Sequence, residues 1–491
     1  MSLEALRALE LGKVLPDGKH LIGGEWVSAQ AGETIDVINP ATQELLLRVP
    51  RGKEVDIDAA CQAAARAFPA WRDMNPTMRA NLLSRWANLL TARSEEISLL
   101  EAIEVGRPHK GRTNIGMNLQ YFAGFADKIT GTTLPSVKPE ALGFTLREPY
   151  GVCGCIVPWN GPTTLMMNDT APCLAAGNTL VVKPAEDAPL ACLLVAKLAL
   201  EAGIPPGVLN IVTGYGNEAG AALPLHPEIR RMGFTGSPET GAIVMKLCAE
   251  HLVPLHLELG GKSPQIVLRD ADLEKAIPTI VRQLVSNSGQ ICYTGTRLLV
   301  EESMRKNVVA AVAQEMQRVR VGQWSDDADM GPLINIKQER RVLDYMEIGR
   351  DEGARLVVGG GKLAGEKFDR GFFVEPTLFD DVKPGMRIAQ EEIFGPVLST
   401  ISFSDPEEAV EIANSTKYGL AASVWTNDLR RAVRVAKGIQ AGQVYVNTYG
   451  WGSVIGAPFG GYKHSGFGRT HGYETILDYT QVKSVIINAE D

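Results

Sequence analysis

The sequence predicts an α/β protein whose centre is a parallel sheet with helices on both faces. Short apolar runs of strand length begin about 25–30 residues apart from Gly151 onward, which is the length of one strand–helix–strand unit. Helix punctuation falls between these runs, with Pro189 near one expected helix start and Gly203 after its end. Strands that alternate with helices in this way favour a parallel sheet covered on both sides.

Three regions follow one another along the chain. The first, up to about residue 145, combines short strand-like runs with segments whose apolar residues recur every three or four positions, as in amphipathic helices. Its expected strands are 19–27 and 35–39, and its expected helices are 56–68 and 77–93. The parallel sheet is predicted from the runs 151–157, 179–183, 208–212, 231–235 and 255–259. After Leu273 we expect a second alternating set, with segments at 356–358, 391–397 and 442–446.

Composition places the chain among soluble, enzyme-sized proteins. Its 491 residues are enough for two or three domains, and 45% of them are hydrophobic and 22% charged. A net charge of −8 without a basic stripe argues against a nucleic-acid or membrane-surface partner. No apolar run is long enough to cross a bilayer, and the N-terminus carries no signal-peptide pattern. Seven cysteines without a regular framework indicate reduced thiols, so a cytoplasmic location is expected.

One cysteine pair raises the question of a metal site. Cys153 and Cys155 are separated by one glycine, but they lie in the strand-like run 151–157 and no second pair of cysteines or histidines is near in sequence. Burial in a strand is therefore favoured over metal binding, and no metal site is expected.

The residues that carry reactive chemistry are Cys292, Glu258 and Asn160. Cys292 follows a turn-like stretch that could expose its sulfur, although an inert buried thiol is the alternative. Glu258 ends an apolar strand before two glycines, where a raised pKa would make it a general base; a solvated carboxylate is the alternative. The Asn160 amide and the Cys292 backbone N–H could stabilise an oxyanion. No obvious motif places a histidine beside the cysteine or the glutamate, so a thiol-protease pair is not supported.

Three stretches at strand ends could contact a nucleotide. The run 214–220 departs from the usual Gly-x-Gly-x-x-Gly spacing and is weak by itself. Gly236 and Ser237 suit a tight turn and a helix start that faces a pyrophosphate, although Ser237 could be a simple helix cap. Lys183 and Glu186 could grip ribose hydroxyls, and the carboxylate would repel a 2′-phosphate. A surface salt bridge is the alternative for this last pair.

Together these stretches resemble the aldehyde dehydrogenase superfamily, in its NAD(P)-dependent, hydrolytic, non-phosphorylating form, and the resemblance covers essentially the whole chain. It rests on ordered motifs: Pro158-Trp159-Asn160, Lys183-Pro184-Ala185-Glu186, Phe234-Thr235-Gly236-Ser237, Leu257-Glu258-Leu259-Gly260-Gly261-Lys262-Ser263-Pro264, Gly289-Gln290-Ile291-Cys292, Glu391-Glu392-Ile393-Phe394-Gly395-Pro396-Val397, Asn447, and Pro458-Phe459-Gly460-Gly461-Tyr462-Lys463-His464-Ser465-Gly466.

The resemblance implies oxidation of an aldehyde to its carboxylic acid with NAD⁺, with NADP⁺ possible. Cys292 would form a thiohemiacetal whose oxyanion Asn160 stabilises, and Glu258 would activate the water that hydrolyses the resulting thioester. The residues implied to bind the cofactor are Trp159, Lys183, Glu186, Gly216, Gly236, Ser237, Leu259, Glu392 and Phe394. The substrate pocket is expected to include Gly161, Asn168, Ile291, Tyr293, Trp451 and Phe459.

The resemblance also implies a Rossmann-like cofactor domain, an α/β catalytic domain and a small β oligomerisation element. We expect the cofactor domain at 1–126 and 147–258, and the catalytic domain at 259–445. The oligomerisation element is expected at 127–146 and 478–491, with a return segment at 446–477 that packs near the active site. A homodimer or homotetramer is therefore expected.

The chain departs from the family pattern in the aldehyde tunnel. Many members carry an aromatic residue at Gly161 and a Trp-Lys pair at Asn168 and Asp169; Asp169 puts a proton-relay role at that position in doubt. Tyr293 follows the nucleophile where smaller residues are common, and these changes favour a bulky or aromatic aldehyde over a simple short one. The alternatives are a CoA-acylating relative, which Glu258 argues against, and a catalytically silent structural relative, which the intact reactive residues argue against.

Overall fold

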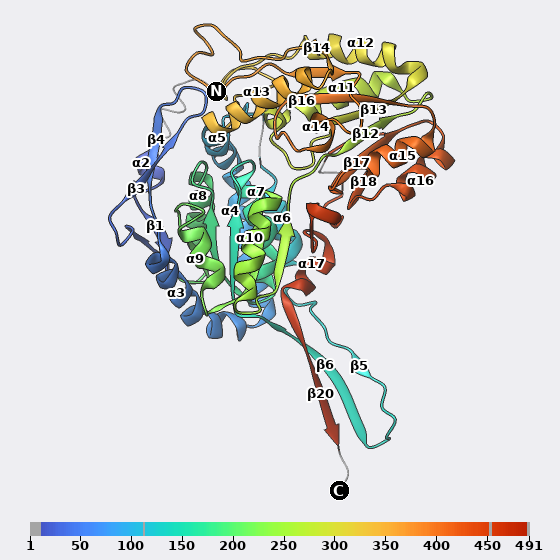
Figure 1. The fold of residues 1–491 in the computed structure, drawn as a ribbon. Helices are drawn as coiled ribbons and strands as arrows, with labels where there is room; N and C mark the ends of the chain where they lie inside the picture. Colours follow the sequence, from blue (N-terminus) through green and yellow to red (C-terminus); the bar gives the residue numbers. More distant parts are fainter. Residues whose placement is uncertain (1–10, 111–112, 451–453, 489–491) are drawn as a thin grey trace.

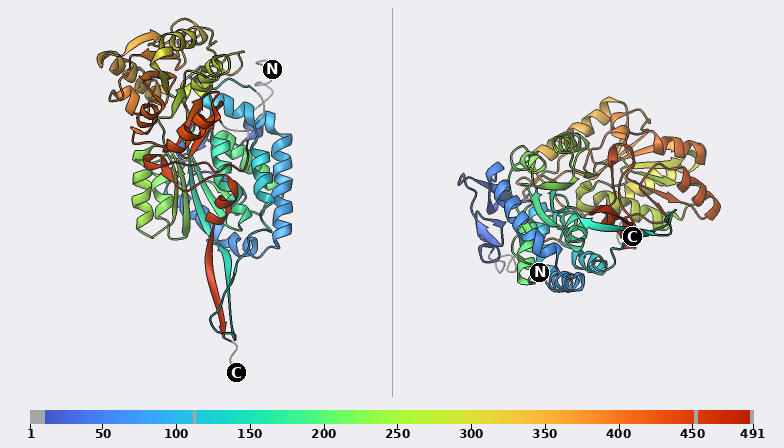
Figure 2. Two further views of the ribbon diagram at one scale, coloured as in Figure 1. Left: turned by 90° about the vertical axis from the view of Figure 1, so that its right-hand side faces the viewer. Right: turned by 90° about the horizontal axis from the view of Figure 1, so that it is seen from below.

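The computed structural model describes residues 11–110, 113–450 and 454–488. It confirms the predicted α/β class. Two large sheets, each packed between helices, form the body of the molecule, and a narrow β arm projects from the unit that contains the N-terminal half of the chain (Figures 1 and 2). The C-terminal end of the described chain lies at the tip of this arm (Figure 1).

The first sheet has eight strands in the order β19-β11-β10-β7-β8-β9-β1-β2. Its five central strands are parallel and fall on the five predicted runs: β7 (Val152–Val157), β8 (Thr179–Pro184), β9 (Leu209–Ile211), β10 (Ile229–Thr235) and β11 (Leu255–Glu258). Antiparallel strands complete both edges. The expected strand at 19–27 is a hairpin of β1 (His20–Ile22) and β2 (Glu25–Val27), and β19 (Gly466–Phe467) arrives from the far end of the chain.

Helices cover both faces of this sheet because its central strands are apolar on both sides. One face packs on α7 (Pro162–Ala175) and α8 (Leu190–Glu201), which are backed by α4 (Pro76–Ala92), α5 (Ser94–Val105) and α6 (Ile115–Ala123). The other face packs on α3 (Glu54–Arg72), α9 (Ala219–Leu225) and α10 (Pro238–Ala249). The short helix α2 (Leu11–Val14) and the hairpin of β3 (Thr34–Ile38) and β4 (Leu45–Pro50) lie outside these layers (Figure 1).

The second sheet has seven strands in the order β14-β15-β16-β13-β12-β17-β18. They are β12 (Pro264–Val267), β13 (Arg297–Glu301), β14 (Arg355–Val358), β15 (Thr377–Asp380), β16 (Val397–Phe403), β17 (Ala421–Trp425) and β18 (Gln443–Val446). The helices on its faces are α11 (Leu273–Val285) and α12 (Arg305–Met316) on one side, and α13 (Ile336–Asp351), α14 (Arg387–Gln390), α15 (Pro406–Asn414) and α16 (Leu429–Gly438) on the other.

Two sequence expectations for this unit were wrong in detail. The alternating set begins at β12, before Leu273, because the buried strand at 264–267 directly follows the glycines after Glu258. The segment 391–396 is a loop rather than a strand, and β16 begins only at Val397. That loop is available to line a cavity.

The arm is a three-stranded antiparallel sheet of β5 (Thr133–Leu134), β6 (Ala141–Pro149) and β20 (Thr480–Asn488). All nine residues of β20 pair with β6, from Thr480 opposite Pro149 to Asn488 opposite Ala141. Helix α17 (Gly472–Asp478) leads the chain from the body into this strand (Figure 1).

A buried arginine ties the start of the second sheet to its neighbours. The Arg297 side chain on β13 is fully buried and donates hydrogen bonds to three backbone oxygens, those of Lys262 (2.8 Å), Ile412 (2.8 Å) and Ala413 (2.7 Å). Lys262 belongs to the turn after Glu258, so this side chain holds the turn against the second sheet.

We expect Arg297→Met to lower the thermal unfolding midpoint by several degrees. The substitution leaves the buried carbonyl groups of Lys262 and Ala413 without a donor, at a cost of about 1–3 kcal/mol each, whereas the Ile412 carbonyl keeps its hydrogen bond from the Ser415 hydroxyl. Scanning calorimetry measures the effect, and Arg430→Met, at an exposed position on α16, is the matched control. Equal midpoints for the two variants would contradict this assignment.

Candidate active site

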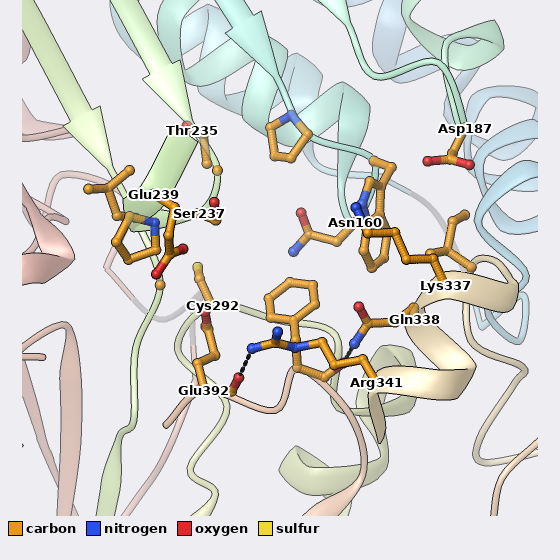
Figure 3. A pocket seen from close by; sticks show the side chains of 18 of the residues that line it. Asn160, Asp187, Thr235, Ser237, Glu239, Cys292, Lys337, Gln338, Arg341 and Glu392 are labelled. Atoms are coloured by element: carbon orange, nitrogen blue, oxygen red, sulfur yellow. Dashed lines mark hydrogen bonds between the residues drawn. The ribbon is translucent and has the colours of Figure 1, made fainter. Parts of the chain in front are cut away.

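A cavity of about 630 Å³ lies between the two α/β units, at the carboxyl ends of the first sheet's strands (Figure 3). Strand β7 lies between β10 and β8, and the helices that follow β7 and β10 cover opposite faces of the sheet. The loops after these two strands therefore separate and leave a crevice, which is where open α/β sheets bind ligands. Predicted residues in the cavity wall are Trp159, Asn160, Glu186, Gly236, Ser237, Leu259, Cys292, Glu392 and Phe394.

Cys292, the expected nucleophile, stands at the end of an unusual backbone loop. Asn287, Ser288 and Gly289 all have left-handed conformations, with φ of 48°, 57° and 73°. Such backbone is rare for residues other than glycine and persists only when its surroundings hold it. At Gly289 a side chain would also collide with the backbone of Gly395. This loop aims Cys292 into the cavity, and the cysteine is the only one of the seven that is not fully buried.

Reciprocal hydrogen bonds fix Asn160 to that loop. Its Nδ2 donates to the Gln290 carbonyl at 2.9 Å, and the Asn287 Nδ2 donates to the Asn160 carbonyl at 2.8 Å. The Gln290 side chain is held in turn by Asn287 and by the backbone N–H of Ile334. One proton of the Asn160 amide is used in this arrangement, which leaves the second available to the cavity that Cys292 also faces (Figure 3).

The resting thiol of Cys292 is strongly favoured over the thiolate. Burial raises its pKa, and the nearby carboxylates of Glu258 and Glu392 raise it further, whereas the backbone N–H of Tyr293 opposes the shift. The sulfur is therefore protected as a thiol until a reacting group or a change in charge alters this balance.

Glu258, at the end of β11, is buried behind the cavity wall rather than in it. Its Oε1 lies 3.2 Å from Nε2 of His256, and its Oε2 has no hydrogen-bond partner within the described residues. Burial raises the pKa of this carboxyl, and His256 and Arg469 oppose the shift. A buried carboxyl with one free oxygen close to a thiol has the chemistry of a general base.

No obvious motif places a histidine beside the cysteine or the glutamate, yet the structure places His256 beside Glu258. His256 precedes it by two residues on the same strand, and alternation along a β-strand places both side chains on one face. No sequence motif marks the pair of His256 and Glu258. The two-residue period of a β-strand does predict that their side chains lie on the same face.

The first turn of α10 lines one side of the cavity. Ser237 caps this helix and accepts a hydrogen bond from the backbone N–H of Thr240 at 3.2 Å, so the cap role that its spacing suggested is present. Beside it, a side chain at Gly236 would collide with the Phe234 ring. A capped helix N-terminus behind a glycine turn is suited to bind a phosphate.

Lys183 and Glu186 form an ion pair of 2.9 Å at the end of β8. Lys183 is buried, whereas Glu186 is partly exposed and lines the cavity. The salt bridge that was the alternative interpretation is thus present, and it points the carboxylate toward the ligand space. Gly216 lies in an exposed turn beside the wall residue Tyr215, and a side chain there would meet open space.

The loop 391–396 supplies the opposite wall. Glu392 accepts a hydrogen bond from the backbone N–H of Gly261 at 3.0 Å, and burial raises the pKa of its carboxyl to about 7 although this bond opposes the shift. Phe394 has a left-handed backbone (φ 62°), and its ring meets Trp159 edge to face at 5.4 Å.

Sequence reasoning missed the contribution of α13 to this wall. Gln338 donates to the Phe394 carbonyl at 2.7 Å, and Arg341 donates to the Glu392 carbonyl (Figure 3). Asn335 and Lys337 also line the cavity, as does Asp187 after β8. No local motif marks these residues, because a helix of the second unit enters the site only through tertiary packing.

Aromatic side chains gather next to the nucleophile. The rings of Tyr293 and Phe459 meet at 5.8 Å, and those of Tyr293 and Tyr449 lie 6.5 Å apart. Burial, with the Cys292 sulfur close by, raises the pKa of Tyr445 to about 12, and the Tyr445 ring lies 5.3 Å from Tyr449. The two tyrosines at 445 and 449 were not predicted.

The other predicted pocket residues have varied settings. Asn168 is buried and accepts a hydrogen bond from Asn118 at 3.1 Å, which joins α7 to α6. Gly161 starts α7 next to the wall residue Leu165, and Ile291 is half-buried beside Cys292. Trp451 lies outside the described residues. For these positions a substrate contact stays a prediction.

Comparison with known proteins places this geometry in a family. The model of the aldehyde dehydrogenase family matches residues 26–485. The hydroxyisobutyraldehyde dehydrogenase of Mycolicibacterium austroafricanum is 43% identical over 474 residues, 96% of this chain and 93% of that protein. The phenylacetaldehyde dehydrogenase of Pseudomonas fluorescens is 42% identical over 504 residues, 98% and 99% of the two chains. The indole-3-acetaldehyde dehydrogenase of P. syringae, solved as a mutant with NAD⁺ and IAA, superimposes with a TM-score of 0.94 at 39% identity, covering 99% of this chain and 98% of that one. The chain belongs to the aldehyde dehydrogenase family.

Proposed function

We propose that this aldehyde dehydrogenase oxidises a bulky or aromatic aldehyde to its acid through a thioester on Cys292 that water hydrolyses. The observation that carries the proposal is the meeting of three groups from separate elements: the Cys292 thiol, the tethered Asn160 amide and the buried Glu258 carboxyl. They supply a nucleophile, an oxyanion donor and a base, which are the parts that covalent acyl transfer needs.

In the first half-reaction, the Cys292 thiol releases its proton to solvent, the sulfur attacks the aldehyde carbon, and the carbonyl oxygen becomes an oxyanion. The free Asn160 amide proton and the Cys292 backbone N–H stabilise that charge. The nicotinamide of bound NAD⁺ supplies the hydride acceptor, which leaves an acyl thioester on the sulfur. In the second half-reaction, Glu258 takes a proton from the water that attacks the thioester carbon. The carbon–sulfur bond then breaks, the carboxylic acid leaves, and the proton held by Glu258 returns to the sulfur to restore the Cys292 thiol.

A substitution at Glu258 separates the two halves. We expect Glu258→Gln to give a rapid burst of NADH, equivalent to about one per active site, followed by a steady rate reduced about 10²–10⁴-fold, because only the second half needs the base. Stopped-flow absorbance measures both phases. Cys292→Ala should show no burst while it still binds NAD⁺, as followed by fluorescence. An unchanged steady rate in the glutamine variant would remove Glu258 from the mechanism.

Acid formation in the absence of CoA distinguishes this mechanism from that of a CoA-acylating relative. Acid formation by the unaltered protein without CoA supports hydrolysis, whereas a strict requirement for CoA would favour the acylating alternative. The presence of Glu258 as a buried carboxyl beside the thiol favours hydrolysis.

NAD⁺ is the cofactor that the wall residues favour. The capped start of α10 suits its pyrophosphate, and the Glu186 carboxylate lies where ribose hydroxyls would be gripped and a 2′-phosphate repelled. Glu392 is a buried carboxyl on the wall opposite the start of α10, and we assign it to the nicotinamide ribose. The relative from P. syringae was solved with NAD⁺, which supports the choice.

Removal of the Glu186 charge should relax cofactor choice. We expect Glu186→Gln to reduce the preference for NAD⁺ over NADP⁺, expressed as the ratio of kcat/KM values, by about tenfold, chiefly through a lower KM for NADP⁺. Initial rates with both cofactors measure this ratio. Glu407→Gln on α15, at an exposed carboxylate away from the cavity, is the control. An unaltered ratio would contradict the assignment.

The aromatic cluster of Tyr293, Tyr445, Tyr449 and Phe459 supports a bulky or aromatic substrate, as do the names of two relatives, a phenylacetaldehyde and an indole-3-acetaldehyde dehydrogenase. Aromatic rings packed at the nucleophile offer edge-to-face contacts that a two-carbon aldehyde cannot use.

We expect a higher kcat/KM for phenylacetaldehyde than for acetaldehyde. Tyr293→Ala should raise the KM for phenylacetaldehyde about tenfold and alter that for acetaldehyde less, because only the larger substrate loses ring contacts. NADH formation across aliphatic and aromatic aldehydes measures both effects. A preference for acetaldehyde in the unaltered protein would overturn the substrate class.

Assembly and organisation complete the proposal. The strands of the arm expose six large apolar side chains, Leu134, Leu142, Leu146, Val482, Ile486 and Ile487, which supports a homodimer or homotetramer that covers them. We propose the oligomerisation element at 127–146 and 478–491, the cofactor domain at 1–126 and 147–258, the catalytic domain at 259–445 and the return segment at 446–477.

Free cysteines support a cytoplasmic location. No helix in the described ranges has the length and apolar character needed to cross a membrane.

A further inference from the structure

A chain of charged groups continues from Glu258 away from the cavity. His256 Nε2 lies 3.2 Å from Glu258 Oε1, and the other ring nitrogen, Nδ1, lies 4.0 Å from Oδ1 of Asp169. The side chains of His256 and Glu258 project from the same face of β11. Asp169 comes from α7, which packs on that face of the sheet. All three side chains are at least nine-tenths buried. A single imidazole is thus enclosed between two carboxyl groups.

Asp169 is held in place from its other side. It accepts hydrogen bonds from the Tyr479 hydroxyl at 2.5 Å and from the Cys155 thiol at 3.1 Å. Tyr479 is itself pinned beneath Arg231, whose guanidinium carbon lies 3.6 Å from the ring centre. A side chain at Gly233 would strike the Asp169 carboxylate, so the neighbouring strand is shaped to admit it. These contacts make Asp169 a fixed anion rather than a mobile one.

We propose that His256, oriented by Asp169, is the positioning residue of Glu258: as an imidazolium it anchors the deacylating carboxylate and keeps it ionised. The proposal rests on the proposed function, in which Glu258 is the base for thioester hydrolysis. A base must be deprotonated to work, and burial alone would protonate Glu258. Asp169 stands where many family members carry a lysine, so in this chain the local cation comes from His256 instead.

The electrostatics agree with this geometry. Burial lowers the pKa of His256, but its interactions with Asp169 and Glu258 outweigh burial and raise the pKa to about 9. The pKa of Asp169 is lowered although burial opposes the shift, because His256, Tyr479 and Arg231 all favour its charge. The imidazolium and the Asp169 carboxylate therefore coexist at neutral pH.

The other charges that face this group are few. Arg469, from the C-terminal loop, also favours the Glu258 carboxylate, and Arg231 on β10 lies on the Asp169 side. The thiol of Cys292 is on the cavity side of Glu258 and is protonated at rest. His256 also lines a cavity with Arg147, Arg231, Glu474 and Asp478. Loss of the His256 charge would remove the cation in direct contact with Glu258, so the pKa of Glu258 must rise.

The charge on His256 determines how the rate of deacylation depends on pH. Below about pH 9 the imidazolium opposes the effect of burial on Glu258, so the pKa of this carboxyl is raised less than burial alone would raise it. Without the imidazolium, Glu258 binds its proton more tightly and deacylation is lost on the acid side first. Raising the pH ionises Glu258 again and restores the rate. A purely structural role for His256 would instead reduce the rate at every pH.

The test compares deacylation rates against pH in four proteins. In His256→Asn, we expect the acid limb of the deacylation profile to move up by at least about one pH unit, which slows hydrolysis about tenfold at pH 7 and leaves it nearly normal at high pH. Asp169→Asn should move the limb less, because it also removes a carboxylate that raises the pKa of Glu258. The NADH burst should persist. His226→Asn is the matched control, because His226 is another buried histidine paired with an aspartate, Asp58 at 3.0 Å. Its profile should match that of the unaltered protein.

A second readout does not depend on turnover. Histidine Cε1 labelled with ¹³C in the unaltered protein gives seven signals, one per histidine, and the one lost in His256→Asn belongs to His256. Its titration midpoint should lie near 9 and should fall in both Asp169→Asn and Glu258→Gln. A midpoint at or below the ordinary value near 6.5 would overturn the proposal even if a variant fails to fold.

The outcomes also separate this proposal from the proposed function. A normal steady rate in Glu258→Gln would remove the base and with it the proposed function, whatever the histidine titration shows. Slow hydrolysis in Glu258→Gln together with an unshifted acid limb in His256→Asn would keep the proposed function and reject the role of His256.

Discussion

The reciprocal hydrogen bonds between Asn160 and the loop 287–290 are the contact on which the rest of the site depends. Asn160 lies in the loop that follows β7 of the first sheet, whereas residues 287–290 follow α11 of the second unit. Because the loop contains three successive left-handed residues, its shape is costly in isolation and must be imposed by its partners. The same bonds that hold this shape also fix the Asn160 amide relative to the Cys292 sulfur, so assembly of the two units also brings these two groups together.

Buried charge is the second constraint. Burial disfavours the ionised form of three carboxyl groups at the site, those of Glu258, Glu392 and Asp169. At each of them a different neighbouring group opposes this effect. Glu392 accepts a backbone N–H, Asp169 has the tyrosine and the arginine behind it, and Glu258 has the histidine. Their environments separate the pKa values of groups that are chemically alike. Such separation allows one carboxyl to bind a ligand while another exchanges protons.

Much of the fold and the reactive centre could be predicted from the sequence. The five parallel strands were visible because buried parallel strands are nearly continuous apolar runs. Cys292, Glu258 and Asn160 were visible because each stands next to a turn or strand end where local chemistry is unusual. What could not be predicted came from distant segments: β19 beside β11, α13 in the cavity wall, and the tyrosines at 445 and 449 beside the nucleophile. Their local sequences are ordinary, and only tertiary packing brings them to the site.

His256 shows a different kind of omission, since it stands two residues from Glu258 in the printed sequence. No sequence motif contains His256, so motifs alone do not reveal its contact with Glu258. The two-residue period of the strand does, because it puts positions 256 and 258 on one face. The meaning of Asp169 was hidden for the same reason, because a charge that is reversed relative to the family pattern has significance only together with the cation that faces it. In a buried network, substitutions at one position constrain the charge at its partner, since an unpaired ion costs far more than either pair. The identity of a buried aspartate is therefore best interpreted through the residue that it faces, and here that residue, His256, is in direct contact with Glu258.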